Sequence, residues 1–164
     1  MIGGIGVDII EVERMRQTVE QYGETFLEKV FTPTELNYSR SKKDVHHHLA
    51  ARFAAKEAFS KAFATGWSGP FRWRDVEVSN DALGKPAITV HGEMKKQLGD
   101  SQILVSISHS DRAVVAVVDF ILSKNAFSEY KHSDDTKIGI NLVNLLRIYS
   151  IVYRYHCMDF LQIL

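Results

Sequence analysis

Residues 50–66 have the sequence AARFAAKEAFSKAFATG, an apolar run that carries four charged side chains. The spacing predicts a helix from about Leu49 to Thr65, with Gly66 as a favourable stop. Apolar residues surround the axis of this helix, which is typical of a helix that is mostly buried. Ionised groups in such a place need partners. The charged side chains are Arg52, Lys56, Glu57 and Lys61.

Glu57 and Lys61 lie on one stripe of the predicted helix, one turn apart. The simplest interpretation is an i,i+4 ion pair, which contributes about 0.3 kcal/mol. However, Ala50 and Ala54 share the stripe, and their small side chains leave room for a ligand beside the pair. The other two charged side chains of the helix point to different sides.

Two regular segments precede this helix. Residues 2–10, IGGIGVDII, begin with glycines and continue with apolar, β-branched side chains, which favours a short buried strand. A helix should follow and end at Gly23, and a second helical piece should continue from there. Thr32 and Glu35 have the spacing of a capping box at the start of another helix, with Pro33 at its first position. The polar residues 39–48 are predicted to be a loop.

Strands dominate the second half of the domain, because β-branched and apolar residues alternate there with turn residues. Strands late in the chain and helices earlier predict an α+β layered fold. The predicted strands lie at residues 75–80, 85–90, 102–110 and 113–122, with a short helix at 92–100.

Composition restricts the class of protein. The 164 residues fit one domain, and 20 basic residues balance 20 acidic ones, which gives no indication of a nucleic-acid partner. Cys157 is the single cysteine, so the sequence predicts no disulfide framework and a cytoplasmic location. No signal peptide and no membrane-spanning helix are expected, since the N-terminus lacks a basic region and no long apolar run occurs.

The C-terminal part of the chain differs from the rest. Residues 123–135 are polar, and residues 138–164 are apolar nearly all round. We predict a domain at residues 1–122 and an extension of unknown role at residues 123–164. A buried helix, a partner-binding helix and a segment foreign to the domain all remain open for the extension.

Asp8 is a carboxylate in the middle of an apolar predicted strand. One interpretation is a cap for the helix that follows. Another is a metal ligand, because two carboxylates from separate elements, together with waters and substrate phosphates, commonly hold magnesium.

Residues 105–112, VSISHSDR, form a third polar site. Ser106 and Ser108 alternate along the predicted strand and share one face, while His109 points to the other face unless the strand ends there. A solvent-facing turn and a Ser–His–Asp triad are alternatives, but no G-x-S-x-G turn is present to support the triad. Hydroxyl and imidazole groups favour phosphate binding. The consecutive histidines at 46–48 suggest zinc only weakly, because their side chains diverge.

Three blocks occur in a fixed order: GIGVDIIEVERM, RFAAKEAFSKAFATG and VSISHSDR. Together they resemble the holo-acyl-carrier-protein synthase family, the small bacterial type of 4′-phosphopantetheinyl transferase. The family's paired signature is matched by Gly6-Val7-Asp8 and by residues 53–61, and residues 84–86, GKP, also match. The resemblance covers about residues 1–122, and the extension departs from it.

The resemblance implies an antiparallel sheet packed around a long central helix, and a homotrimer. It implies transfer of 4′-phosphopantetheine from coenzyme A, the substrate, to a serine of apo acyl carrier protein for fatty acid biosynthesis, with Mg²⁺ as cofactor. Adenosine 3′,5′-bisphosphate is the other product. Alternatives are transfer to polyketide or peptide-synthetase carrier domains, a non-catalytic trimeric binding module, and a magnesium-dependent nucleotide hydrolase, for which no P-loop is present.

Roles for individual residues also follow from the resemblance. Asp8 and Glu57 would hold Mg²⁺, and Glu57 or a metal-bound water would accept the proton. Lys61 would be catalytic with Glu57, neutralising a diphosphate oxygen or the departing phosphate. Arg14 and Arg16 would dock the acidic carrier protein. Contacts with coenzyme A are implied for Arg52, Lys61, Gly84, Lys85, Pro86, Ser106, Ser108 and His109.

Overall fold

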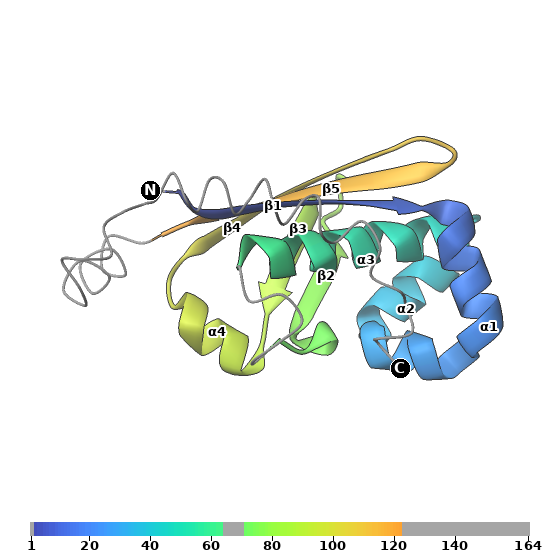
Figure 1. Ribbon diagram of the computed structural model, residues 1–164, viewed down its shortest axis with the longest axis horizontal. Coiled ribbons are helices and arrows are strands. Elements are labelled where there is room, and N and C mark those ends of the chain that lie inside the picture. The colour runs from blue at the N-terminus through green and yellow to red at the C-terminus, as the bar shows by residue number, and fades with distance from the viewer. Residues whose placement is uncertain (1, 64–70, 123–164) are drawn as a thin grey trace.

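Helix α3, Val45–Ala62, runs through the middle of the protein, with a sheet on one side and smaller elements on the other (Figure 1). The computed structural model describes residues 2–63 and 71–122. The side chain of Asp44 caps α3 by accepting a hydrogen bond from the His47 backbone N–H at 3.1 Å. The helix therefore begins earlier than predicted, and the three histidines lie in its first turns and not in a loop. The predicted stop at Gly66 lies outside the described residues.

The sheet consists of β1 (Ile2–Glu11), β5 (Ala113–Ile121) and β4 (Gln102–His109), in the order β1-β5-β4. Both pairings are antiparallel, and Asp8 lies opposite Ala116, which in turn lies opposite Ile107. Alternate side chains of β1 and β5 are buried toward α3, so the period-2 pattern of the sequence matches the sheet. The predicted antiparallel sheet around a central helix is confirmed.

Two glycines allow β1 to lie directly on α3. A Cβ atom on Gly6 would lie 2.0 Å from the carbonyl oxygen of Ala58, and one on Gly4 would lie 2.1 Å from that of Ala62. Such distances are impossible for a real side chain, so only glycine permits this approach. Gly4, Gly6 and Asp8 alternate on the same face of β1, and the glycines thereby bring Asp8 down onto the helix.

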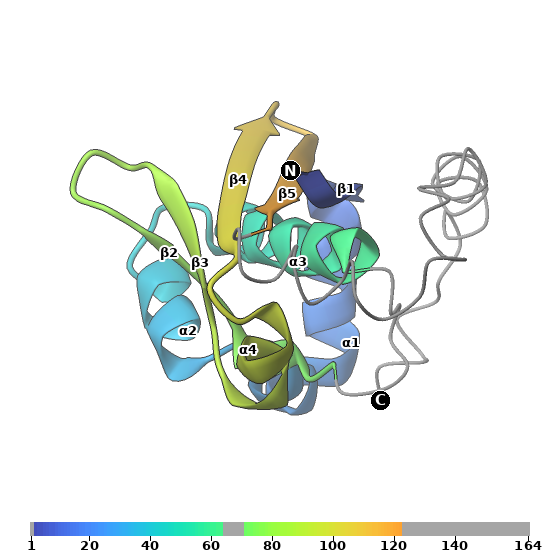
Figure 2. The same ribbon diagram turned by 90° about the vertical axis from the view of Figure 1, so that its left-hand side faces the viewer.

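Helix α1, Val12–Val30, contains the break predicted at Gly23, whose backbone is non-helical with φ 55° and ψ −141°. Glycine adopts this positive φ without steric cost. Helix α2, Pro33–Arg40, begins with the predicted capping box: Thr32 Oγ1 accepts from the backbone N–H of Glu35, and Glu35 accepts from that of Thr32. Both helices pack on the side of α3 that faces away from the sheet (Figures 1 and 2).

The remaining elements complete this second side. The 3-10 helix η1, Trp73–Asp75, leads into a hairpin of β2 (Val76–Asn80) and β3 (Pro86–Val90), followed by the short helix α4 (Gly92–Leu98). Figure 2 shows the hairpin beside α2, with α3 seen nearly end-on between the hairpin and α1. The Trp73 ring stacks on Phe53 of α3, with centroids 4.9 Å apart, which anchors the start of the hairpin to the core. No described helix is both long and apolar enough to cross a bilayer.

Candidate active site

Three predicted residues meet where β1 crosses α3. Lys61 Nζ lies 2.7 Å from Asp8 Oδ1 and 3.6 Å from Glu57 Oε1. Asp8 comes from the sheet, and Glu57 and Lys61 come from successive turns of the helix. The expected Glu57–Lys61 pair exists, but the shorter contact of Lys61 is with Asp8, a residue that a helical wheel cannot include.

Burial of this cluster changes its titration. The side chains of Asp8 and Glu57 are each 8% exposed. Burial, and after it the neighbouring charge of Asp8, raise the pKa of Glu57 to about 7 against the lowering effect of Lys61. Burial also raises the pKa of Asp8 above 3.8, against the lowering effect of Lys61. Two neighbouring carboxylates that are largely shielded from water favour the binding of a cation.

The donor set fits magnesium. Asp8 Oδ2 is buried and has no hydrogen-bond partner within the described part of the chain. Within residues 2–63 and 71–122, no three His, Cys, Asp or Glu side chains are grouped to hold a metal ion. Two carboxylates alone suit Mg²⁺, which keeps several waters and takes further oxygen ligands from substrate phosphates.

Arg14 lies close enough to the cluster for its charge to lower the pKa of both Asp8 and Glu57. It is half-buried on α1, one turn after β1 ends. Arg16 is more peripheral: its side chain is 42% exposed and lies 3.4 Å from Glu13. The predicted carrier-docking residues are therefore on the helix that leads directly out of the site, and their role in docking stays a prediction.

His109 is at the end of β4 and meets the first turns of α3. Its ring packs edge-to-face on His47, with centroids 4.6 Å apart, and His47 Nε2 lies 3.1 Å from the carbonyl oxygen of Ser110. His47 therefore contacts both the predicted phosphate-binding histidine at the end of β4 and the start of the loop between β4 and β5. This contact was not predicted, because the run of histidines at 46–48 suggested only a weak zinc site.

Ser106 and Ser108 lie on the opposite face of the sheet from Asp8. Both are exposed and alternate with Ile103, Val105 and Ile107, which pack against the core. The expectation that the two serines share a face is correct, but the face points away from α3. Within one chain, therefore, these serines do not join Asp8 and Glu57, because the strand's alternation separates them.

The predicted cofactor turn, residues 84–86, closes the β2–β3 hairpin. Asp81 Oδ1 accepts the backbone N–H groups of Leu83 and Lys85, both at 2.9 Å, which holds the turn in shape. Gly84 has φ +86°, a conformation for which glycine is suited. Gly84 and Lys85 are exposed at the surface.

Arg52 and Lys56 face the side of α3 away from the sheet, as their separation from Glu57 and Lys61 on the wheel predicts. Arg52 is only 2% exposed and stacks over the Tyr38 ring at 4.1 Å. Burial lowers the pKa of Arg52 and of Lys56. The prediction that Arg52 binds the cofactor stays a prediction, and burial does not favour it.

Comparisons with known proteins agree with this arrangement. The family model of the 4′-phosphopantetheinyl transferase superfamily matches residues 4–118. Holo-[acyl-carrier-protein] synthase of Halothermothrix orenii is 44% identical over 121 residues, which cover 72% of this chain and 96% of the relative. That of Solibacter usitatus is 43% identical over 113 residues, 67% of this chain and 90% of the relative.

Solved structures give the same result. A holo-(acyl-carrier-protein) synthase from Bacillus anthracis, in complex with CoA (3′,5′-ADP), superposes with a TM-score of 0.64 at 38% identity, covering 75% of this chain and 99% of that one. The synthase from Neisseria meningitidis gives a TM-score of 0.68 at 35% identity, with coverage of 74% and 99%. The chain belongs to the 4′-phosphopantetheinyl transferase superfamily and, within it, to the holo-[acyl-carrier-protein] synthases.

Proposed function

We propose that the protein is a Mg²⁺-dependent holo-[acyl-carrier-protein] synthase. It transfers 4′-phosphopantetheine from coenzyme A to a serine of apo acyl carrier protein and releases adenosine 3′,5′-bisphosphate. The observation that carries the proposal is the convergence of Asp8, Glu57 and Lys61 in a chain of this family. The bound coenzyme A of the Bacillus anthracis relative supports the same substrate here.

Asp8 and Glu57 would hold the metal, because both carboxylates are buried beside Lys61 and Asp8 Oδ2 has no hydrogen-bond partner among the described residues. A bound Mg²⁺ supplies positive charge that offsets the charge of the diphosphate. Lys61 adds a second positive charge at the same place, and its flexible side chain can reach a phosphate oxygen. These positive charges offset the negative charge of the phosphate oxygens and so favour attack on the phosphorus.

In the transfer step, the carrier's serine oxygen forms a bond to the β-phosphorus of coenzyme A. The bond between that phosphorus and the bridging oxygen breaks, and adenosine 3′,5′-bisphosphate leaves with the electron pair. The serine proton passes to Glu57 or to water. Lys61 neutralises the leaving phosphate. Arg14 is close enough for its positive charge to act on Glu57, and this charge favours the approach of an acidic carrier protein.

A homotrimer is part of the proposal. The outer face of the sheet is apolar, with Ile5, Val7 and Ile9 of β1 exposed by 41–49% and Val117 of β5 by 37%. Asp119 is on the same face, and its buried Oδ1 has no partner among the described residues. A second copy would cover this face and bring its own residues to Ser106 and Ser108. A cytoplasmic location, where coenzyme A and carrier proteins meet, completes the proposal.

A mass measurement tests the transfer. The protein is incubated with coenzyme A, Mg²⁺ and an apo acyl carrier protein, and the carrier is weighed by mass spectrometry. A gain equal to one phosphopantetheine group is expected, and Asp8→Asn or Glu57→Gln should nearly abolish it without loss of the fold. No gain with any carrier protein would refute the proposal. Modification of polyketide or peptide-synthetase carriers alone would favour that alternative.

A further inference from the structure

The rings of His47 and His109 are in contact although the two residues lie far apart in the sequence. His47 lies in the first turns of α3, and His109 is the last residue of β4. Their rings pack edge-to-face, with centroids 4.6 Å apart and an interplanar angle of 87°. In the described part of the chain no three His, Cys, Asp or Glu side chains are grouped to hold a metal ion, so a zinc site does not account for the contact.

A hydrogen bond gives this packing a direction. His47 Nε2 lies 3.1 Å from the carbonyl oxygen of Ser110, the residue that follows His109. A carbonyl oxygen can only accept, so the proton of this contact is on His47 Nε2. One side chain of α3 therefore contacts both the ring of His109 and the backbone of the next residue.

The turn after His109 is held by other bonds, but these act on its backbone. Ser110 Oγ accepts the backbone N–H of Arg112 at 3.3 Å, and the Arg112 carbonyl oxygen accepts that of Val12, the first residue of α1, at 2.8 Å. Among residues 2–63 and 71–122, only His47 makes a hydrogen bond or a ring contact with the side chain of His109. The direction of the His109 ring therefore depends on His47.

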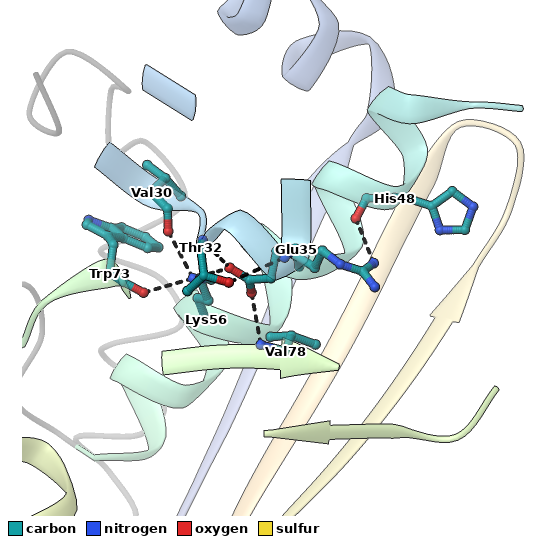
Figure 3. A network of polar contacts seen from close by, with 8 residues as sticks. Val30, Thr32, Glu35, His48, Lys56, Trp73 and Val78 are labelled. Atoms are coloured by element: carbon teal, nitrogen blue, oxygen red, sulfur yellow. Dashed lines mark hydrogen bonds and ion pairs between the residues drawn. The ribbon is translucent and has the colours of Figure 1, made fainter. Parts of the chain in front are cut away.

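The first turns of α3 give His47 a firm support. The Asp44 side chain accepts the backbone N–H of His47 at 3.1 Å and so caps the helix. The carbonyl oxygen of His48 accepts a hydrogen bond from Arg52 Nη1 at 3.1 Å (Figure 3). Arg52 is only 2% exposed, so this second bond is anchored in the interior. The helix is thus fixed on both sides of His47.

His109 itself is exposed, whereas His47 is half-buried. An exposed histidine at the end of a strand can occupy several rotamers. Such a side chain loses rotational freedom when it binds a ligand, and this loss weakens binding. A neighbouring ring that restricts the rotamer in advance removes part of this cost. An imidazole held in one direction is therefore a better partner for a phosphate group than a free one.

We propose that His47 is a positioning residue that presents the imidazole of His109 to a phosphate group of coenzyme A. His47 acts through His109 and does not touch the ligand, because its Nε2 is engaged by the Ser110 carbonyl. This inference rests on the proposed function and on the predicted contact between His109 and coenzyme A. It gives one member of the histidine run a role that the other members do not share.

His47→Ala is the main variant, because it removes both the ring contact and the hydrogen bond. His46→Ala is the matched control: it changes the preceding residue of the same run, whose side chain makes no hydrogen bond or ring contact with the described residues. Isothermal titration with coenzyme A, without carrier protein, measures the affinity. His47→Ala should bind about three- to tenfold more weakly than the unaltered chain, and His46→Ala should stay within about twofold.

Steady-state kinetics separate positioning from a general loss of structure. KM for coenzyme A should rise in His47→Ala by a similar factor, while kcat stays within about twofold, because Asp8, Glu57 and Lys61 are unaltered. Circular dichroism checks that each variant is folded. A fall in kcat without a change in KM would contradict the inference.

A double-mutant cycle tests whether His47 acts through His109. His109→Ala should weaken binding of coenzyme A, and the double variant His47→Ala/His109→Ala should bind no more weakly than His109→Ala alone. Strictly additive losses would overturn the inference, because His47 would then act independently. An unchanged affinity in His109→Ala would overturn it as well, since no contact would remain to be positioned.

A second variant covers failure of His47→Ala to fold. His47→Gln keeps an N–H donor for the Ser110 carbonyl but has no ring to pack on His109, so weaker binding of coenzyme A is again expected. Affinities equal to that of His46→Ala would overturn the inference and leave the proposed function intact. If the unaltered chain binds no coenzyme A, the proposed function itself fails, which is a different result.

Discussion

Lys61 Nζ is 2.7 Å from Asp8 Oδ1 and 3.6 Å from Glu57 Oε1. Its ammonium therefore lies beside both of the carboxylates that we propose as metal ligands. A dication and an ammonium in contact with the same carboxylates repel each other. We therefore expect the lysine to compete with a bound metal ion until a phosphate group gives the ammonium another partner. On this hypothesis, Lys61 lowers metal affinity but promotes transfer.

Substitution of Lys61 by methionine should separate these effects. At alkaline pH, where both carboxylates are ionised, Lys61→Met should bind Mn²⁺ about tenfold more tightly than the unaltered chain. Transfer should fall by about a hundredfold, because a charge at the leaving phosphate is lost. Electron paramagnetic resonance of Mn²⁺ measures the affinity without turnover. Lys96→Met, at an exposed site on α4, is the control. Weaker Mn²⁺ binding in Lys61→Met would contradict the competition.

The raised pKa of Glu57 predicts a pH-dependent stability of the metal-free protein. Folding moves this pKa from 4.5 to about 7, so the folded state binds the proton more tightly than the unfolded state. The contribution of Glu57 to stability must then fall as the pH rises from about 4.5 to about 7, by up to about 3 kcal/mol. Urea unfolding at a series of pH values should show this slope, and Glu57→Gln should remove most of it. Identical slopes in both proteins would count against the assignment.

Magnesium should reverse this trend, because it binds the ionised carboxylate. The increase in melting temperature on adding Mg²⁺ should be small below the pKa of Glu57 and should grow as the pH rises through about 7. Differential scanning calorimetry with and without Mg²⁺ measures it. A Mg²⁺ effect independent of pH would mean that Glu57 is not a ligand.

Replacement of Gly6 by alanine should separate β1 from α3. The added Cβ would meet the Ala58 carbonyl oxygen at 2.0 Å, and neither backbone can yield without lifting the strand. We expect a loss of about 3 kcal/mol or more in stability and loss of transfer, since Asp8 would move away from Glu57. Gly3→Ala is the control, because the three atoms nearest to its added Cβ belong to the side chain of Leu122 and not to backbone. Equal melting temperatures for Gly6→Ala and the unaltered chain would contradict the close packing.

A charge on the outer face of the sheet should prevent assembly. Val117 lies on the central strand β5 within the apolar face, so Val117→Glu would place a carboxylate in the proposed interface between copies. Analytical ultracentrifugation should show trimers of the unaltered chain and monomers of the variant. Lys95→Glu, on the exposed surface of α4, should remain trimeric. A monomeric unaltered chain would refute the trimer directly.

Local patterns in the sequence were enough to predict much of the fold. The capping box at Thr32 and Glu35, the break at Gly23 and the alternation of the strands depend on near neighbours, and the structure confirms each of them. The start of α3 was placed too late, because the polar segment before it has loop-like composition although Asp44 caps the helix. Residues 123–164 lie outside the described residues, and their separation as an extension stays a prediction.

The site could be predicted only in part, because several of its contacts join residues far apart in the chain. Lys56 is paired with Glu35, for which the sequence predicted only a role in capping α2. The close approach at Gly4 and Gly6 had a visible signal, glycine at alternate positions leading to Asp8, but the identity of the opposing helix was not readable. Which face of the sheet a set of serines occupies depends on register, which a single strand does not reveal.

The pairing of β1 with β5 has a consequence for the order of events during synthesis. Asp8 leaves the ribosome early, but Ala116, its neighbour in the sheet, is made only when the domain is almost complete. The β1–β5 pairing that fixes Asp8 in the sheet therefore cannot form in a partial nascent chain that lacks β5, even after α3 has formed. Such a long-range closure is slow relative to helix formation. The growing polypeptide thus fixes Asp8, a proposed cation ligand, in the sheet at a late step, after most of its hydrophobic residues are already available for packing.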